Sequence, residues 1–306
     1  MTNKLLLKTV YLLLPVFTIA LLFSSCKSGG KEKDKEVPVE VSEVDEALMQ
    51  DVNEAKKIFY SLPSPLESAM LIKSAGATFN EDLLNPTANT SRYSTNKQMA
   101  LNLGIYTCDL SFASLYDQTQ LVIDYMSAAR EMADGLGILD AIDEETISRL
   151  EENINNREVI LDIVSETFLA SNSYLEDNEQ PAIASIVLVG GWVEGLYIAT
   201  QLVDMDEFDS DKLAGRIIDQ KLSVGIMLQL LEDNIDHPAV TEVMEQMEEV
   251  KVIFDKISIK TTDITPEIDE ETNVTVLKST IETNMTPEIF TELARKVEQI
   301  RSSYVK

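Results

Sequence analysis

The chain contains few of the residues that bind metals or act as nucleophiles. Its 306 residues include one histidine, His237, and two cysteines, Cys26 and Cys108. Zinc fingers, di-iron Glu-x-x-His sites and H-E-x-x-H sites each require several histidines or cysteines together. We therefore expect no metal site, no cofactor and no catalytic residue of these kinds. Cys108 stands in an apolar pattern and is expected to be a buried thiol.

Positive charge is also scarce. The chain has 25 Lys and Arg against 53 Asp and Glu, which gives a formal net charge of -28. Such a field repels polyanions, so we expect no nucleic-acid partner. The densest acidic stretch, residues 204–211, lacks the glycine and the closing glutamate of an EF-hand loop. We expect this stretch to begin a helix rather than to bind Ca²⁺.

The N-terminus has the order of a bacterial lipoprotein signal. Lys4 and Lys8 precede an apolar run over 10–23, and small residues stand directly before Cys26. Residues 1–25 are therefore expected to be a signal peptide, with a lipid on Cys26. An ordinary signal peptide and an uncleaved anchor are the alternatives.

Residues 26–42 combine the lipidated cysteine with a charged stretch that has no apolar periodicity, which is typical of a flexible tether. We expect a protein anchored to the outer membrane through this lipid, facing the periplasm or the cell surface. The folded part would begin at about residue 43.

Apolar residues then recur at helical spacing almost to the end of the chain. Helices are predicted over 44–59, 65–75, 95–134, 142–155, 157–175, 181–203, 210–235, 238–258 and 289–304. Residues 77–94 have the composition of a loop, and the Thr-rich, β-branched residues 261–284 predict an extended piece or a hairpin. The fold class is therefore all-α, a multi-helix bundle with a short β-hairpin near the C-terminus. Residues 43–260 form the helical domain, and 261–306 pack on it.

Several predicted helices begin with a capping residue close to a proline in the first turn. Ser64 and Glu67 are placed for a capping box around Pro65. Pro238 and Pro287 occupy first-turn positions, with Asp236 and Thr286 available as caps.

The segment 183–203 is long and apolar enough to span a membrane. Glu194 near its middle would be costly in lipid, so we expect the central buried helix of a bundle. Gly191, Gly195 and Ala199 lie four residues apart and predict a close approach by a neighbouring backbone.

Two sets of polar residues are candidates for a ligand-binding site. Glu194, Trp192 and Tyr197 lie within this apolar helix, where a glutamate must be paired, protonated or next to a wet cavity. A structural bond to a Lys, Arg or Tyr of a facing helix is the favoured alternative. Asn102, Tyr106 and Asp109 share one face of another helix, where they line a cavity or form a solvated surface; the solvated surface is favoured.

Three stretches, 62–67, 102–106 and 190–197, resemble a family of uncharacterised helical lipoproteins from Bacteroidetes. The resemblance implies a source and a compartment. It implies no activity and no catalytic residue.

The sequence thus predicts a membrane-tethered binding or scaffold module for an unknown small molecule or protein. A carboxylate-dependent enzyme with Glu194 and Asp109 as an acid and base pair is one alternative. A purely structural envelope protein is the other.

Overall fold

The structure is a computed structural model that describes residues 64–139, 144–261, 265–268, 275–278 and 281–306. All of these residues belong to one compact unit. The predicted signal peptide, the lipidated Cys26, the tether and the predicted helix over 44–59 lie outside the described residues.

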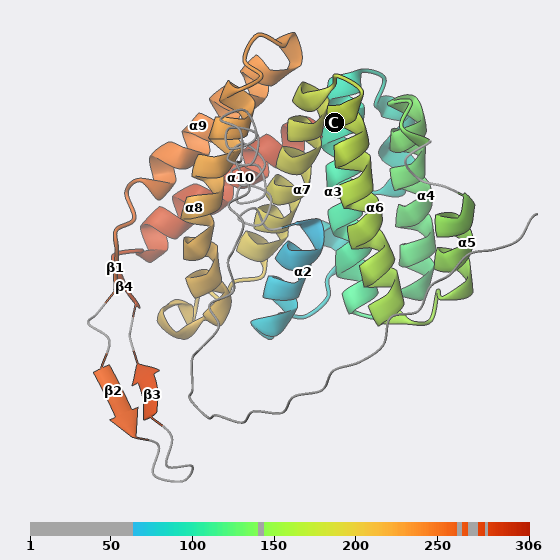
Figure 1. Cartoon of the computed structure of the whole chain (residues 1–306). Coiled ribbons are helices and arrows are strands. Elements are labelled where there is room, and N and C mark those ends of the chain that lie inside the picture. Colours follow the sequence, from blue (N-terminus) through green and yellow to red (C-terminus); the bar gives the residue numbers. More distant parts are fainter. Residues whose placement is uncertain (1–63, 140–143, 262–264, 269–274, 279–280) are drawn as a thin grey trace, which may run out of the picture. The chain divides into compact units, whose positions relative to one another are not determined.

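The predicted all-α fold class is confirmed (Figure 1). The α-helices are α2 (Pro65–Ser74), α3 (Asn96–Leu115), α4 (Thr119–Gly135), α5 (Glu144–Glu152), α6 (Arg157–Asp177), α7 (Pro181–Gln201), α8 (Lys212–Glu232), α9 (Pro238–Phe254) and α10 (Pro287–Tyr304). The predicted loop over 77–94 contains two short 3₁₀ helices, η1 (Glu81–Leu83) and η2 (Thr87–Arg92). A third, η4 (Phe208–Ser210), precedes α8.

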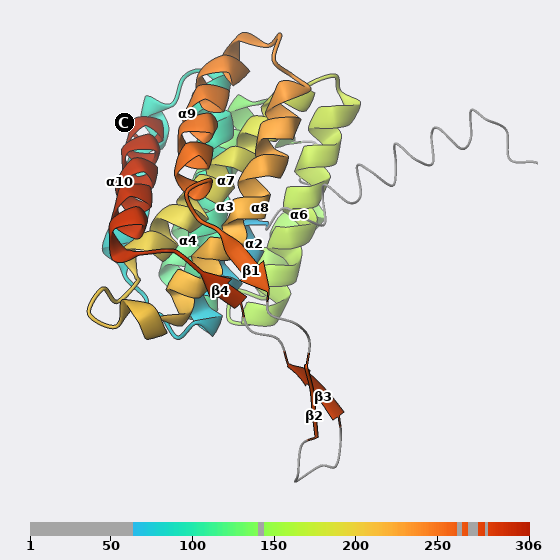
Figure 2. The same ribbon diagram turned by 90° about the vertical axis from the view of Figure 1, so that its left-hand side faces the viewer.

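Helix α7 is the central element of the bundle. It contacts α2, α3, α6, α8, α9 and α10, and nearly all of its residues are buried. Its length and hydropathy would suit a membrane span, but 89% of the apolar window is buried within the protein. The prediction of a buried central helix is therefore confirmed. Figure 2 shows α7 and α3 surrounded by the other helices.

Helices α3 and α7 approach so closely that only glycine fits at their crossing. A Cβ on Gly104 would overlap the carbonyl oxygen of Val187 and lie 2.5 Å from the amide nitrogen of Gly191. A Cβ on Gly190 would overlap the carbonyl oxygen of Leu101. Of the predicted positions, Gly191 faces the backbone of Gly104, whereas Gly195 faces the Ser68 side chain. The tightest contact on α7 is at Gly190, which the prediction did not include.

The prediction of one long helix over 95–134 is wrong. Helix α3 ends at Leu115 and α4 begins at Thr119, with Asp117 between them at a φ of 58°. Asp is among the few residues that adopt this left-handed conformation without glycine's freedom. The turn contains neither Gly nor Pro, so the sequence shows no ordinary helix stop.

The helix caps agree with the sequence except at one position. The Ser64–Glu67 capping box is present, and Thr286 caps α10. The expectation for Asp236 is wrong, because the N-cap of α9 is His237, whose Nδ1 accepts a hydrogen bond from Ala239 N at 3.3 Å. With Pro238 as the first helical residue, the cap must be the residue directly before it. Asp211 begins α8, as the acidic stretch predicted, by accepting from Leu213 N and Ala214 N.

The C-terminal part contains the predicted hairpin. Strand β1 (Ile259–Thr261) pairs antiparallel with β4 (Ile281–Thr283), and β2 (Thr265–Ile268) pairs antiparallel with β3 (Thr275–Lys278). Helix α10 follows and packs on α7 and α9. This contact positions the end of the chain against the core.

Candidate functional site

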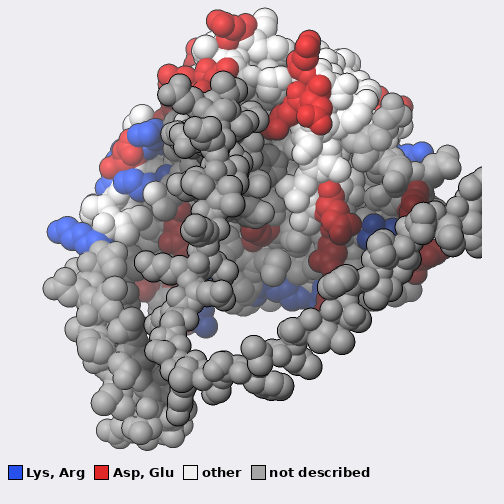
Figure 3. Space-filling model, in the orientation of Figure 1, with Lys and Arg blue, Asp and Glu red and all other residues white. Residues whose placement is uncertain are grey.

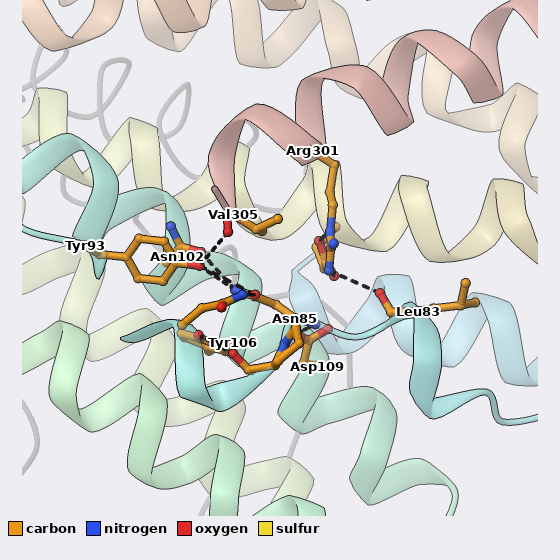
Figure 4. A network of polar contacts seen from close by, with 11 residues as sticks. Leu83, Asn85, Tyr93, Asn102, Tyr106, Asp109, Arg301 and Val305 are labelled. Carbon is orange, nitrogen blue, oxygen red and sulfur yellow. Dashed lines mark hydrogen bonds and ion pairs between the residues drawn. The ribbon is translucent and has the colours of Figure 1, made fainter. Parts of the chain in front are cut away.

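A bidentate ion pair lies in the core between α7 and α10. Arg301 Nε and Nη2 donate to the two carboxylate oxygens of Glu194, each at 2.9 Å, and Glu194 is 0% exposed. Arg301 Nη2 also donates to Leu83 O at 3.1 Å (Figure 4). The guanidinium lies 4.7 Å from the centre of the Tyr197 ring, a cation–π distance. The expectation that Glu194 is buried and paired by a facing helix is confirmed.

Asp109 on α3 is a second buried carboxyl group near this ion pair. Its pKa is raised well above the usual range, because burial disfavours the charged form and the Glu194 carboxylate adds to the effect. Arg301 opposes this rise. Asp109 Oδ2 accepts from Asn85 N at 3.1 Å. The protonated form of Asp109 is therefore favoured, because the charge of Arg301 is already balanced by the Glu194 carboxylate.

Asn102 and Tyr106 extend this network away from the ion pair. Asn102 Nδ2 donates to Gln98 O and to Tyr304 O, both at 2.9 Å, and its oxygen accepts from Asn85 Nδ2 at 3.0 Å. Tyr106 donates through its hydroxyl to Pro86 O at 3.1 Å. The favoured expectation of a solvated surface for Asn102, Tyr106 and Asp109 is wrong, because all three are buried. Apart from Gln98 O on the same helix, their partners lie in the 77–94 segment and at the C-terminus, which helical spacing does not place.

Trp192 does not take part in this buried network. Its indole nitrogen donates to Gln220 Oε1 on α8 at 3.0 Å, and its ring is buried. The structure therefore brings five of the six predicted site residues into one buried region and leaves Trp192 in the α7–α8 contact. Because the polar atoms of this region largely pair with each other, it has the character of a structural network that holds α10 and the 77–94 segment to the bundle.

A different part of the molecule contains an apolar pocket. It has a volume of about 270 Å³ and lies between α4 and α6, with residues of α3 and α7 forming its inner wall. Both α4 and α6 pack on α3 (Figure 1). Most of the lining is hydrocarbon, from Leu103, Leu110, Ile123, Met126, Leu150, Val164, Phe168, Leu175 and Val187. This volume is close to the lower end of ligand pockets, about 300 Å³, and is larger than a cavity of about 150 Å³ that holds benzene.

Asn172 on α6 is one of the residues that line this pocket, and its amide is unpaired. The residue is 0% exposed, and neither its Nδ2 nor its Oδ1 has a hydrogen-bond partner in the described part of the chain. A buried amide without partners costs about 1 to 3 kcal/mol. Most buried amides in folded proteins are paired, as Asn102 is. Asn172 therefore has the chemistry of a group that meets a ligand.

Arg130 on α4 lies at the exposed rim of the same pocket. Among the described lining residues it is the only charged one. Its guanidinium has no hydrogen-bond or ion-pair partner among the residues that the structure describes. Acidic groups are scattered over the face shown in Figure 3, with a white, uncharged area among them. The pocket thus combines a mostly apolar lining, the hydroxyl groups of Thr107, Ser127, Thr167 and Ser171, a buried amide and a peripheral cation.

Sequence reasoning missed this pocket, although one signal was present. Phe168, Asn172 and Leu175 are spaced by four and three residues, so the asparagine falls on the apolar face of α6. A polar residue on the buried face of a helix marks either a structural bond or a binding group. The gap between α4 and α6 could not be inferred, since α3 and α4 were predicted as one helix.

The comparisons with protein-family models, with curated proteins and with solved structures gave no significant match. Among the described residues, no group of three or more His, Cys, Asp or Glu is placed to hold a metal ion.

Proposed function

We propose that the protein is a lipid-anchored binding protein whose helical domain holds a small, largely apolar ligand in the pocket between α4 and α6. The unpaired, fully buried amide of Asn172 carries this proposal. The anchor rests on the signal pattern before Cys26 and on the charged tether that follows it. An outer-membrane location, and membership of the helical Bacteroidetes lipoproteins, belong to the same proposal.

Binding is favoured over catalysis for a chemical reason. The described residues that line the pocket include no carboxylate, histidine or cysteine, so none of them is an ordinary general acid or base. The carboxylate pair that could serve an enzyme, Glu194 and Asp109, is fully buried, and Glu194 is bound to Arg301. The pocket and the unpaired amide of Asn172 together favour binding over a purely structural role.

A pair of tryptophan variants tests the use of the pocket. Ala129 on α4 lines it and is half-buried, whereas Ala170 on α6 is exposed and does not line it. We expect the full chain to bind N-phenyl-1-naphthylamine, an uncharged apolar fluorophore, at one saturable site. Ala129→Trp should remove this binding because the indole fills the pocket, and Ala170→Trp should keep it. A fluorescence titration that is the same for both variants would place the probe elsewhere and contradict the proposal.

A further inference from the structure

The positive charge of Arg130 at the pocket rim indicates that one group of the ligand is negatively charged. The chain carries 53 acidic residues, yet the one charged side chain among the described residues lining the pocket is the cation Arg130. Its guanidinium is exposed at the rim and has no partner in the described part of the molecule. A guanidinium pairs best with a planar carboxylate, through two parallel hydrogen bonds. The rim is therefore suited to a carboxylate.

Asn172 indicates a second, different ligand group. Its amide offers donors at Nδ2 and an acceptor at Oδ1, and both atoms are unpaired. A carboxylate can only accept hydrogen bonds, so it would leave Oδ1 without a partner. A secondary amide both donates and accepts, and it is neutral, which suits a fully buried position. The interior therefore favours an amide rather than a second charge.

The remaining lining is mostly hydrocarbon, with the hydroxyl side chains of Thr107, Ser127, Thr167 and Ser171 among it. The volume of about 270 Å³ limits the ligand to a short chain. We propose that the ligand belongs to the N-acyl amino acids: a short acyl chain fills the apolar pocket, the amide pairs with Asn172, and the carboxylate meets Arg130. This inference rests on the proposed function and specifies the ligand class for the same site.

Calorimetric titration of the full chain with two matched compounds tests this class. N-octanoylglycine carries both polar groups, and its methyl ester lacks the charge. We expect the acid to bind about two- to five-fold more tightly than the ester, as for an exposed ion pair. Arg130→Gln should remove this preference. Arg295→Gln should retain it, because Arg295 on α10 is exposed and does not line the pocket, although the change in net charge is the same.

Asn172→Leu tests whether the Asn172 side chain pairs with the amide of the ligand. It should weaken N-octanoylglycine about ten-fold, because the ligand amide loses its partner, and leave the affinity for N-phenyl-1-naphthylamine within about two-fold. Equal affinities for acid and ester, or a preference that survives Arg130→Gln, would overturn the ligand class. The binding function would then still stand if Ala129→Trp blocks the fluorophore. If neither the two acyl compounds nor the fluorophore binds, the ligand class and the binding function are both overturned.

Discussion

Arg301→Met is expected to lower the free energy of unfolding by about 3 to 5 kcal/mol, the cost of breaking a buried ion pair from one side. The variant leaves the Glu194 carboxylate in the core without its cation, and Asp109 is a second carboxyl group nearby. The hydrogen bond to Leu83 O is lost as well. Urea denaturation, followed by circular dichroism, measures the change.

Lys296→Met is the matched control on the same helix. Lys296 pairs with Glu249 at 2.8 Å, but that glutamate is more than half exposed. A surface pair of this kind contributes about 0 to 1 kcal/mol. A second comparison is the double variant Arg301→Met with Glu194→Leu, which removes both charges and should recover part of the loss. Equal, small losses for Arg301→Met and Lys296→Met would mean that the buried pair does not hold α10 to α7.

The loss in the free energy of unfolding caused by Arg301→Met should depend on pH. Burial and Glu194 raise the folded-state pKa of Asp109, so the folded protein binds this proton more tightly than the unfolded chain does. The contribution of Asp109 to stability is therefore largest at low pH and falls as pH rises through that raised pKa. Arg301 opposes the rise, and its removal extends the loss to higher pH. Asp109 should therefore add nothing to the stability deficit of the variant at low pH, where it is protonated in both proteins, and should enlarge the deficit as pH rises above its raised wild-type pKa.

Gly190→Ala is expected to lower the free energy of unfolding by about 3 kcal/mol, at the upper end of the cost of overpacking. The added methyl group would overlap the carbonyl oxygen of Leu101 and lie 2.9 Å from the Cα of the same residue. Both contacts are backbone atoms, so no side chain can rotate away. The α3 and α7 backbones would have to separate at the centre of the bundle.

Gly225→Ala is the control for this substitution. Gly225 lies in α8, and a Cβ there would meet nothing within 4 Å. Alanine has the better helix propensity, so this variant should gain up to about 1 kcal/mol. Opposite changes in the urea midpoint are therefore expected for the same chemical substitution. A neutral result for Gly190→Ala would contradict the close crossing of the two helices.

Periodicity and local signals predict much of this fold. The apolar run of α7 predicts a buried central helix, and helical spacing predicts α9, in which Val240, Val243 and Met247 are buried. The break between α3 and α4 could not be predicted, because Asp117 adopts a left-handed conformation that its neighbours do not signal. That break separates α4 from α3 and allows the pocket to form.

The candidate site residues show more clearly that local sequence patterns do not reveal contacts between distant segments. Glu194 was recognisable because a charge in an apolar helix requires a partner, but Arg301 lies 107 residues away and no local pattern identifies it. Asn102 was assigned to a surface because helical spacing shows which residues share a face and not what covers it. Asn172 is polar on an apolar face in the same way as Asn102. Only the packed structure distinguishes the paired amide of Asn102 from the unpaired one of Asn172.

These two asparagines provide the most direct test of the claim that Asn172 is kept for a ligand. Both are 0% exposed, and Asn102 has its amide paired while Asn172 does not. In urea denaturation of the ligand-free protein, Asn172→Leu should raise the free energy of unfolding by about 1 to 3 kcal/mol, since it removes an unpaired buried amide. Asn102→Leu should lower it by a similar amount, because its partners are left unpaired. If Asn172→Leu instead destabilises the protein as Asn102→Leu does, the Asn172 amide is satisfied within the fold and the claim is contradicted.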